Sequence, residues 1–520
     1  MRLGGHAVVE QLLAESVDLA FCVPGESYLP VLDGLYDARE RLRLITTRHE
    51  SGAAMMAAAY GKLTGRPGIC LVTRGPGATN ASGGVHVARQ DASPMVLLVG
   101  QVPTRLRGLR AFQEVDYGAM FAPLAKAVLE AGHPDRLPEL IARACRTAVA
   151  GEPGPVVVVL PEDVLSATTD APVVPPAPVA SAAVDTTEFV ARLDKAERPL
   201  LVVGGSGWSP LATVQVREFA ESHGIPVATA TRHQDLVDNT APVYVGSLGL
   251  NTTPGLADLV SEVDVLAFVG TRPDALTVDD FALKLPARLL HIHPDPAVLQ
   301  SVYQAELAIV AAPTTFAAAL PHGTREPTAW LDRLRANYLR DPQPPPGVDP
   351  APYMAELLSR VPADAIFSTG AGAYTAWPQR YRKFTHYPSQ LGTQSGTMGY
   401  GLPAAITARL VHPDRTAVAF AGDGCFLMTG QELATAVRYG LAPLVIVVNN
   451  STYGTIEQHQ TRRFPGREYG TSLENPDFAA FARSFGAQAE QVRTPAEFAS
   501  ALDRLLPLDD ATRVIEIVTR

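Results

Sequence analysis

The chain has 520 residues, of which 47% are hydrophobic and 18% charged, and its formal net charge is −10. This length allows three or four domains with ordinary cores, the charge argues against a nucleic-acid partner, and no apolar run approaches the roughly 18 residues that a membrane span needs. The four cysteines, Cys22, Cys70, Cys145 and Cys425, are scattered among apolar or small residues, which predicts buried thiols in a cytoplasmic protein.

Two segments rich in proline divide the chain. Residues 166–185 and 323–352 are expected to be linkers, because they show no sustained hydrophobic period. They separate an N-terminal domain (1–165), a central domain (186–322) and a C-terminal domain (353–520). Strand-like apolar runs alternate with helical stretches in each part, which predicts an α/β protein of three doubly wound parallel-sheet domains.

The N-terminal part starts with an expected amphipathic helix over residues 1–16, which does not read as a signal peptide. Glu50 follows a strand-like run and stands at the head of a helix whose alanines allow close packing. An acid is common there merely because it favours the positive helix end, so the position alone leaves both a structural and a catalytic interpretation open. Further along, Gly75-Pro76-Gly77 predicts a tight turn after the next strand.

In the central part, strand-like runs occupy residues 198–207, 263–272 and 287–295. The last run contains His291 and His293, which share one face of a strand. No further metal ligands cluster nearby in the sequence, so no metal is expected there.

The C-terminal part carries an acidic turn, Gly422-Asp423-Gly424, after the apolar run 417–420. A predicted helix over 431–438 leads to a second buried strand, 444–448, which ends at Asn449-Asn450. A right-handed crossover makes the two strands parallel neighbours, so Asp423 and Asn450 should meet at one sheet edge. An Asp carboxylate, an Asn side-chain oxygen and a backbone carbonyl such as that of Thr452 suit Mg²⁺ that also binds phosphate oxygens.

Just before this unit, Gly396, Gly399 and Gly401 surround Met398. Glycines let a backbone approach a flat ligand closely, although a helix-packing cluster would have the same composition. Met398 is a large and adaptable apolar residue among them.

The Gly-Asp-Gly turn, the 24 residues after it and the Asn pair together resemble the signature of the thiamin-dependent decarboxylases and carboligases. Acetolactate synthase and benzoylformate decarboxylase are the most similar in these motifs. The resemblance implies a pyrimidine-binding, a middle and a diphosphate-binding domain, with thiamine diphosphate and Mg²⁺ as cofactors. It implies that the metal is held by Asp423, Asn450 and Thr452.

The resemblance also assigns roles to single residues. Glu50 should bind the pyrimidine N1′ and promote loss of the proton from thiazolium C2, Met398 should hold the cofactor bent, and the Gly396 carbonyl should receive its amino group. The expected cofactor-binding residues are Glu50, Gly396, Met398, Gly422, Asp423, Gly424, Cys425, Asn450, Thr452, Tyr453, Gly454 and Thr455.

On the substrate side the likeness is closer to acetolactate synthase in some places than in others. The loop at Gly75 lacks the histidine that several decarboxylases carry there. Gln113 matches a glutamine that faces the substrate in acetolactate synthases, although it could equally belong to an ordinary polar loop. His459 stands where acetolactate synthases have a tryptophan, and it is either an acid/base group or an exposed helix histidine. Ala373-Tyr374 replaces their Gln-His. The expected catalytic residues are Glu50, Gln113 and His459, and the expected substrate pocket is formed by Gly25, Gly75, Phe112, Gln113, Met398, Thr455, Ile456 and His459.

The implied reaction is decarboxylation of a 2-oxo acid such as pyruvate and ligation of the resulting acyl carbanion to a carbonyl acceptor. A decarboxylase of the benzoylformate type that releases an aldehyde, and a cofactor-binding paralogue or subunit without activity, are the alternatives. FAD is not expected, because the central part lacks a Met-His-Gly motif and has no second arginine four residues after Arg272. The family builds its sites across a dimer interface, which implies a homodimer or homotetramer.

Overall fold

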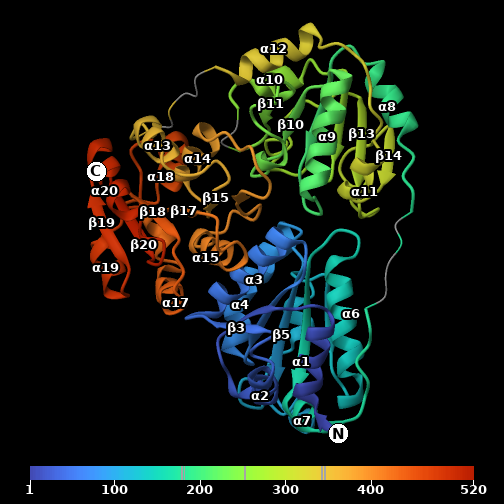
Figure 1. Cartoon of the computed structure of the whole chain (residues 1–520), viewed down its shortest axis with the longest axis vertical. Coiled ribbons are helices and arrows are strands. Elements are labelled where there is room, and N and C mark those ends of the chain that lie inside the picture. The colour runs from blue at the N-terminus through green and yellow to red at the C-terminus, as the bar shows by residue number, and fades with distance from the viewer. Residues whose placement is uncertain (177–179, 181, 251–252, 341–343, 345–346, 520) are drawn as a thin grey trace.

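The computed structural model describes residues 1–176, 180, 182–250, 253–340, 344 and 347–519. These residues form three α/β domains, shown in Figure 1 with the N-terminal domain in blue to cyan, the central domain in green to yellow and the C-terminal domain in orange to red. Within the described residues each domain contains a six-stranded sheet whose strands all pair in parallel, flanked by helices. The predicted fold class is confirmed.

The sheet of the N-terminal domain has the strand order β3-β2-β4-β5-β7-β6. Its inner strands are buried along their whole length and consist almost entirely of apolar residues, because both faces of the sheet are covered. The strands are β2 (Leu19–Cys22), β3 (Arg43–Thr46), β4 (Gly68–Val72), β5 (Met95–Gln101), β6 (Ala127–Glu130) and β7 (Pro155–Pro161). The helices are α1 (Gly4–Ala14), α2 (Leu29–Asp37), α3 (Glu50–Thr64), α4 (Pro76–Gln90), α5 (Tyr117–Phe121), α6 (Leu137–Val149) and α7 (Glu162–Ser166). A small antiparallel pair joins β1 (Arg2–Leu3) to β8 (Thr168–Thr169).

The C-terminal sheet repeats this topology, with the strand order β16-β15-β17-β18-β20-β19. Its strands are β15 (Ile366–Thr369), β16 (Gln390–Leu391), β17 (Ala417–Gly422), β18 (Leu444–Asn449), β19 (Gln488–Val492) and β20 (Arg513–Val518). Its helices are α13 (Ala351–Leu358), α14 (Ala376–Tyr381), α15 (Gly401–Val411), α16 (Asp423–Phe426), α17 (Leu433–Arg438), α18 (Gly454–Arg463), α19 (Phe478–Ser484) and α20 (Pro495–Leu505). In both domains the strand order reverses beside the first strand, which is where open α/β sheets bind ligands.

The central sheet has a different strand order, β11-β10-β9-β12-β13-β14, and reverses between β9 and β12. Its strands are β9 (Pro199–Val203), β10 (Val227–Thr229), β11 (Tyr244–Ser247), β12 (Val265–Val269), β13 (Arg288–His293) and β14 (Leu307–Val310). Its helices are α8 (Thr187–Asp194), α9 (Pro210–His223), α10 (Leu256–Val260), α11 (Pro313–Ala318) and α12 (Ala329–Tyr338).

Helix α12 lies within residues 323–352, which the sequence predicts to be a linker. Trp330, Leu331 and Leu334 of this helix are buried in the central core, so the helix belongs to the central domain. The sequence does not indicate this helix, because its apolar residues form only one short stripe beside a proline-rich run.

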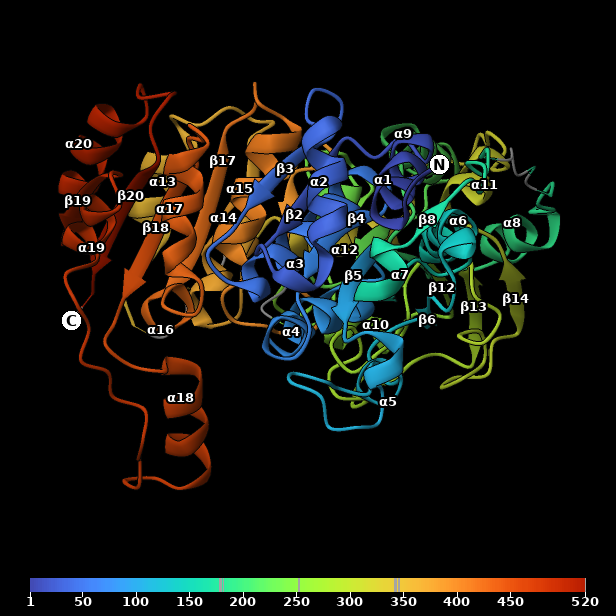
Figure 2. The same cartoon turned by 90° about the horizontal axis from the view of Figure 1, so that it is seen from below.

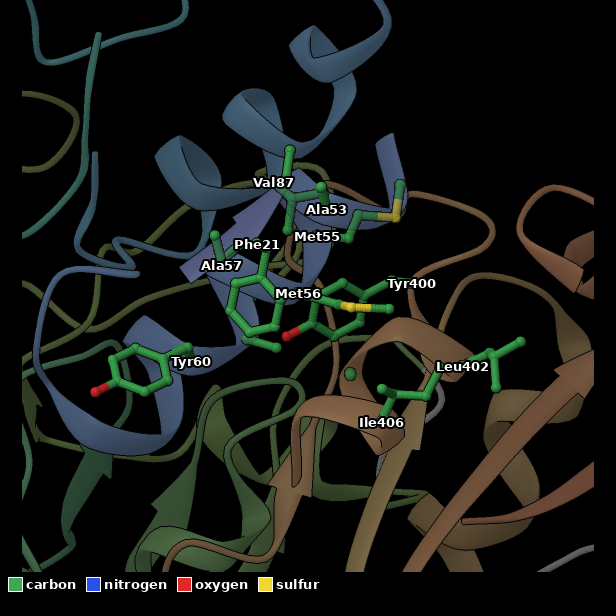
Figure 3. Packing of buried hydrophobic residues seen from close by; sticks show 14 of the residues in the cluster. Phe21, Ala53, Met55, Met56, Ala57, Tyr60, Val87, Tyr400, Leu402 and Ile406 are labelled. Carbon is green, nitrogen blue, oxygen red and sulfur yellow. The ribbon is translucent and has the colours of Figure 1, made fainter. Parts of the chain in front are cut away.

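One hydrophobic core continues from the N-terminal into the C-terminal domain. Helix α3 packs against α15, and Figure 3 shows Met56 of α3 beside Tyr400, which immediately precedes α15. The expected close packing of the alanine-rich helix is present, since a Cβ on Gly84 of α4 would lie 2.4 Å from the Ala54 Cβ. These two domains are thereby fixed to each other by side-chain packing.

Helix α18 lies outside these cores. Figure 2 shows it projecting from the C-terminal domain, and none of its residues is buried. Over the part of the chain that the structure describes, no helix is both long enough and apolar enough to cross a membrane.

Candidate active site

A cavity of about 460 Å³ lies at the carboxyl ends of β15, β17 and β18 in the C-terminal domain. It occupies the point where the strand order reverses, and the loops that follow these strands form its walls. The lining residues are Gly347, Val348, Ala371, Gly372, Ala373, Tyr374, Trp377, Gly396, Met398, Gly422, Asp423, Gly424, Cys425, Val448, Asn450, Thr452, Tyr453, Gly454, Thr455, Ile456, Glu457, Gln458 and Thr519. Except for Glu50, every residue expected to bind the cofactor is among them.

Asp423 and Asn450 meet in this cavity as predicted. Strands β17 and β18 are parallel neighbours with Gly422 opposite Val448, so the residues that follow them emerge at one edge. Asp423 is 3% exposed, and its oxygens accept hydrogen bonds from the Gly424 amide (2.9 Å) and from Asn475 Nδ2 (2.7 Å). Burial nevertheless raises the pKa of Asp423, because these bonds only partly replace the lost hydration.

The two asparagines of the pair have different surroundings. Asn449 is held in the sheet: its Nδ2 donates to Glu516 Oε1 (2.7 Å) and its Oδ1 accepts from Asn475 Nδ2 (2.9 Å). Asn450 instead lines the cavity. Sequence reasoning missed Asn475, which links Asp423 to Asn449 from 52 positions along the chain and carries no motif of its own.

The oxygen groups at this edge fit a hard divalent cation. Asp423 supplies a carboxylate, and Asn450 and Thr452 lie beside it in the same wall. The described residues contain no cluster of three or more His, Cys, Asp or Glu that could hold a metal by themselves. A cation here would therefore complete its coordination with phosphate and water, as Mg²⁺ commonly does.

The opposite wall is built for close backbone approach. Gly396 and Gly399 have φ of 63° and 86°, and they place the half-buried Met398 at the cavity. On the other side, a Cβ on Gly424 would lie 2.5 Å from the Tyr453 ring, so only glycine fits between that ring and the strand end.

Tyr374, at the position where the sequence departs from the Gln-His of acetolactate synthases, turns toward Cys425. Its hydroxyl donates to Cys425 Sγ (3.0 Å), which also accepts the Gly399 amide (3.1 Å). Burial raises the pKa of the Tyr374 hydroxyl far above its ordinary value, so it remains a neutral donor. The pair ties the loop after β15 to the turn after β17.

The N-terminal domain contains a second group of predicted residues. Glu50 begins α3, is 9% exposed, and accepts a hydrogen bond from Asn80 Nδ2 (2.9 Å). Gly77 lies against it, since a Cβ there would be 3.4 Å from Glu50 Oε1. Gln113, with φ of 64°, rests on Gly75, whose amide donates to the Tyr117 hydroxyl (2.7 Å).

These two groups do not form one pocket within a single chain. No residue of the N-terminal domain is among the described residues that line the cavity, so Glu50 and Asp423 belong to separate surfaces. The predicted substrate pocket is divided in the same way, with Gly25, Gly75, Phe112 and Gln113 on one surface and Met398, Thr455 and Ile456 on the other. Phe112 is 75% exposed and Ile456 52% exposed.

His459 lies on the exposed helix α18 and is not among the residues that line the cavity. Its Nδ1 lies 3.0 Å from Arg462 Nη2. This placement corresponds to the exposed-helix interpretation of His459 in the isolated chain.

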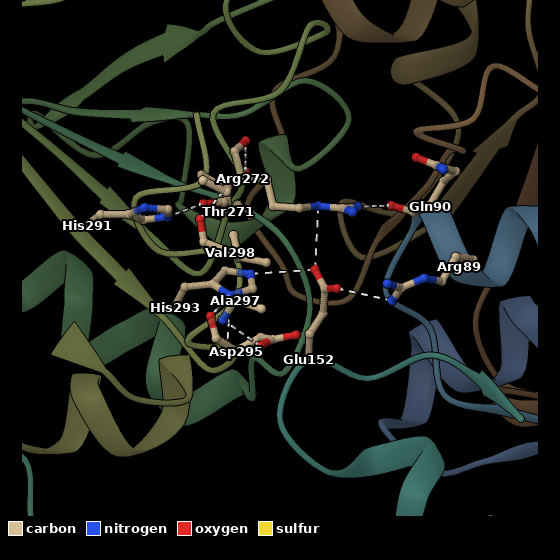
Figure 4. Close-up of polar contacts among 12 residues, drawn as sticks. Arg89, Gln90, Glu152, Thr271, Arg272, His291, His293, Asp295, Ala297 and Val298 are labelled. Carbon is tan, nitrogen blue, oxygen red and sulfur yellow. Dashed lines mark hydrogen bonds and ion pairs between the residues drawn. The ribbon is translucent and has the colours of Figure 1, made fainter. Parts of the chain in front are cut away.

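A second polar centre lies where the central sheet reverses, and Figure 4 shows its contacts. The buried Glu152 is 3.5 Å from Arg272 Nε, 3.3 Å from Arg89 Nη1 and 3.6 Å from His293 Nε2. Burial lowers the pKa of His291 and of His293 to about 4, and their rings contact backbone groups of Thr271 and Asp295. The histidines therefore belong to a buried neutral packing arrangement.

Comparisons with known proteins match all three domains. Residues 2–120, 186–320 and 370–517 match the N-terminal TPP binding, central and C-terminal TPP binding domains of thiamine pyrophosphate enzymes. The acetolactate synthase large subunit of Corynebacterium glutamicum is 33% identical, over 99% of this chain and 86% of that protein. The isozyme 2 large subunit of Escherichia coli is also 33% identical, over 97% of this chain and 94% of that protein. A probable large subunit of Methanocaldococcus jannaschii is 31% identical over 99% and 91%.

Proposed function

The chain belongs to the thiamine pyrophosphate enzyme family, and from this we propose that it is a carboligase of the acetolactate-synthase type, dependent on thiamine diphosphate and Mg²⁺. The observation that carries the proposal is the meeting of Asp423 and Asn450 in a cavity of about 460 Å³. The substrates would be a 2-oxo acid donor such as pyruvate and a carbonyl acceptor. The names of the relatives favour ligation over simple decarboxylation.

The residues of the cavity would divide the work of binding. Asp423, Asn450 and the Thr452 carbonyl would hold Mg²⁺, and the backbone of Gly424 and Gly454 would lie along the diphosphate. When bound, thiamine diphosphate would supply a nucleophilic carbon for the oxo-acid carbonyl and an electron sink for the electron pair that stays behind when CO₂ leaves. Met398 would pack against the cofactor and hold it in a bent conformation. As an apolar side chain it would also keep water from the reacting carbonyl, and a dry pocket favours loss of the charged carboxylate as CO₂.

Glu50 would hold and move the proton that starts the reaction. Its Oε2 is occupied by Asn80, which leaves Oε1, beside Gly77, to face the cofactor ring. A glycine at this point leaves room for a flat ring against the carboxylate. Gln113 would face the substrate from the same surface.

The site would be completed by a second copy of the chain. Glu50 and Asp423 lie on separate surfaces, and large apolar side chains are exposed on both domains: Leu109 and Phe112 on the N-terminal domain, and Leu427, Met428 and Ile456 on the C-terminal domain. Burying them between two chains would bring a carboxylate from one copy to the cavity of the other. We expect a homodimer or a homotetramer in light scattering.

The central domain would act as a scaffold without FAD. The described residues at its strand reversal, including Gly205, Gly270 and Arg272, enclose about 20 Å³, which suits one water molecule and not a dinucleotide. Glu152, the cations Arg89 and Arg272 and the neutral His293 occupy that position. We expect no flavin absorbance in protein that has been incubated with FAD and then separated from unbound FAD.

A cytoplasmic location is part of the same proposal. The four cysteines are free and buried in the structure, and unpaired thiols are usual where the environment is reducing. The net charge of −10 gives no electrostatic reason to expect a nucleic-acid partner.

The test is CO₂ release by the purified protein with thiamine diphosphate and Mg²⁺, using pyruvate, 2-oxobutanoate, phenylpyruvate and benzoylformate in turn. NMR of the products is expected to show a 2-hydroxy ketone or acetohydroxy acid, whereas an aldehyde alone would favour the decarboxylase alternative. CO₂ release by the Glu50→Gln variant serves as the background rate. No release above that background from any of the four acids would contradict the proposal.

A further inference from the structure

The loop 47–49, which joins β3 to α3 and precedes Glu50, is held by a carboxylate from the C-terminal domain. Glu432 Oε1 accepts the backbone amides of His49 (3.0 Å) and Arg48 (3.2 Å), and its Oε2 also lies 3.2 Å from the Arg48 amide. These amides immediately precede the residue that we propose to be the proton-transfer group. A contact between domains thus acts on the backbone next to Glu50.

Glu432 is fixed for this contact. It is 0% exposed, and the Thr435 hydroxyl donates to its Oε2 (2.6 Å). Burial raises its pKa, since the two amides and the hydroxyl only partly replace water. A Cβ on Gly52 would lie 2.5 Å from Glu432 Oε1, so the first turn of α3 leaves just enough room for the carboxylate.

The same C-terminal segment also holds the strand that leads into the loop. The Tyr439 hydroxyl accepts the Thr46 amide (2.8 Å) and lies 3.4 Å from the Leu44 carbonyl, to which it donates. Glu432 and Tyr439 flank helix α17 (Leu433–Arg438), so the residues at the two ends of one short helix contact β3 and the loop that follows this strand.

Ordinary helix capping does not account for this arrangement. Helix α3 already has a cap, because His49 Nδ1 accepts the Ser51 amide (3.2 Å) and contacts the Ser51 hydroxyl (2.7 Å). Glu432 instead binds the two amides that stand before the helix. Its carboxylate fixes the backbone from which the Glu50 side chain starts.

We propose that Glu432 is a positioning residue for Glu50: its carboxylate holds the 47–49 loop so that the Glu50 side chain reaches the cofactor at the correct distance. This inference rests on the proposed function of Glu50. A proton-transfer group must be held within a fraction of an ångström of its productive position. Loss of the two amide bonds would therefore act on proton transfer more than on cofactor binding.

The experiment compares the full-length wild-type protein with Glu432→Ala, Glu432→Gln and Thr512→Val. The last variant is the matched control, since it removes a buried side-chain bond of the C-terminal domain, from Thr512 to the Leu441 carbonyl (2.8 Å), that involves no residue of the loop and leaves Glu432 and Tyr439 in place. Three quantities are measured: amide hydrogen exchange of residues 46–52 without cofactor, the affinity for thiamine diphosphate, and exchange of the C2 proton of bound cofactor after acid quench.

In Glu432→Ala we expect faster exchange of the Arg48 and His49 amides, and C2-proton exchange slowed by roughly tenfold to a hundredfold, with cofactor affinity changed by less than about threefold. Glu432→Gln retains one acceptor oxygen and should lie between the alanine variant and the wild type. Thr512→Val should match the wild type. Unchanged amide exchange, or a loosened loop with C2-proton exchange within twofold of wild type, would overturn the inference.

Two further variants keep the test decisive. If Glu432→Ala does not fold, Gly52→Ala displaces the same carboxylate from the other side and should give the same pattern. Glu50→Gln separates the two proposals: if it leaves C2-proton exchange intact, the role of Glu50 fails and the inference fails with it. If it abolishes exchange while the Glu432 variants do not change it, only the inference fails.

Discussion

We expect Glu50→Gln to abolish nearly all turnover while leaving much of the cofactor affinity. Asn80 Nδ2 donates to Glu50 Oε2 at 2.9 Å, and an amide nitrogen cannot accept that bond. The glutamine must therefore turn its oxygen toward Asn80 and place its NH₂ group at the Oε1 position beside Gly77. This group can donate a hydrogen bond to a ring nitrogen, but it cannot transfer a proton at neutral pH.

The expected magnitudes follow from this geometry. A positioned acid or base contributes about 10²- to 10⁴-fold to the rate, so turnover should fall by that factor, or about 3–5 kcal/mol in the barrier. Binding loses only the difference between a charge-assisted and a neutral hydrogen bond, about 1 kcal/mol, which is roughly a fivefold weaker affinity.

The structure offers a direct binding assay. Trp377 is the one tryptophan among the described residues that line the cavity, and Trp208 and Trp330 are buried in the central core. Quenching of Trp377 fluorescence should therefore report cofactor binding, with Trp377→Phe as the control for the signal. CO₂ release at saturating cofactor gives the turnover.

Asn80→Ala is the matched variant. It keeps the carboxylate and removes its partner, so we expect a loss of about 1–2 kcal/mol in the barrier, roughly tenfold in turnover. The reasoning is refuted if Glu50→Gln retains more than about a tenth of wild-type turnover, or if Asn80→Ala is as inactive as Glu50→Gln.

Three other substitutions test the remaining parts of the structure. Asn475→Ala leaves Asp423 Oδ2 without its 2.7 Å partner, so calorimetric titration should show Mg²⁺ affinity reduced by about 10–100-fold, and unchanged affinity would contradict the role of Asn475. Gly424→Ala puts a Cβ 2.5 Å from the Tyr453 ring, so Trp377 fluorescence should show cofactor affinity weakened by at least about tenfold; equal affinity would show that the wall yields. Asp235 is a buried residue of the central domain whose Oδ2 accepts the amides of Ser389 and Gln390. Burial raises its pKa from 3.8 to about 6, so the stability that its protonated form contributes is present below pH 3.8 and lost as the pH rises through 6, where the folded protein bears the cost of a buried charge. Asp235→Asn avoids that cost of about 3 kcal/mol, so its apparent melting temperature should exceed that of wild type at pH 8 and approach it near pH 4; the same difference at both pH values would exclude this explanation.

The sequence predicted those parts of the site that depend on neighbouring strands. The apolar runs before Asp423 and Asn450, with a helix between them, were sufficient to place both residues at one sheet edge, and β17 and β18 confirm this. Glu50 was placed correctly at the start of a helix, because a strand, a short loop and an alanine-rich segment occur in that order. Local patterns determine such positions.

Contacts made by returning loops and between domains could not be predicted. Asn475 reaches Asp423 through a loop that crosses back over the strand ends, where Thr452 bridges to Ser472. Glu432 contacts Arg48 from 384 positions away, and no periodicity marks either residue. The division of the substrate residues between two surfaces is not marked by any residue pattern, and only the resemblance, which implies sites built across a dimer interface, led us to expect it.

Glu50 and Asp423 are encoded by one gene, but they lie on separate surfaces of its product. In a dimer whose sites pair opposite surfaces, a chain without Glu50 and a chain without Asp423 can still assemble one intact site, while the second site of that molecule carries both defects. Two alleles that are each inactive alone would then complement each other in the same cell. If instead one allele carries both substitutions, a mixed dimer of that chain and a wild-type chain contains no intact site.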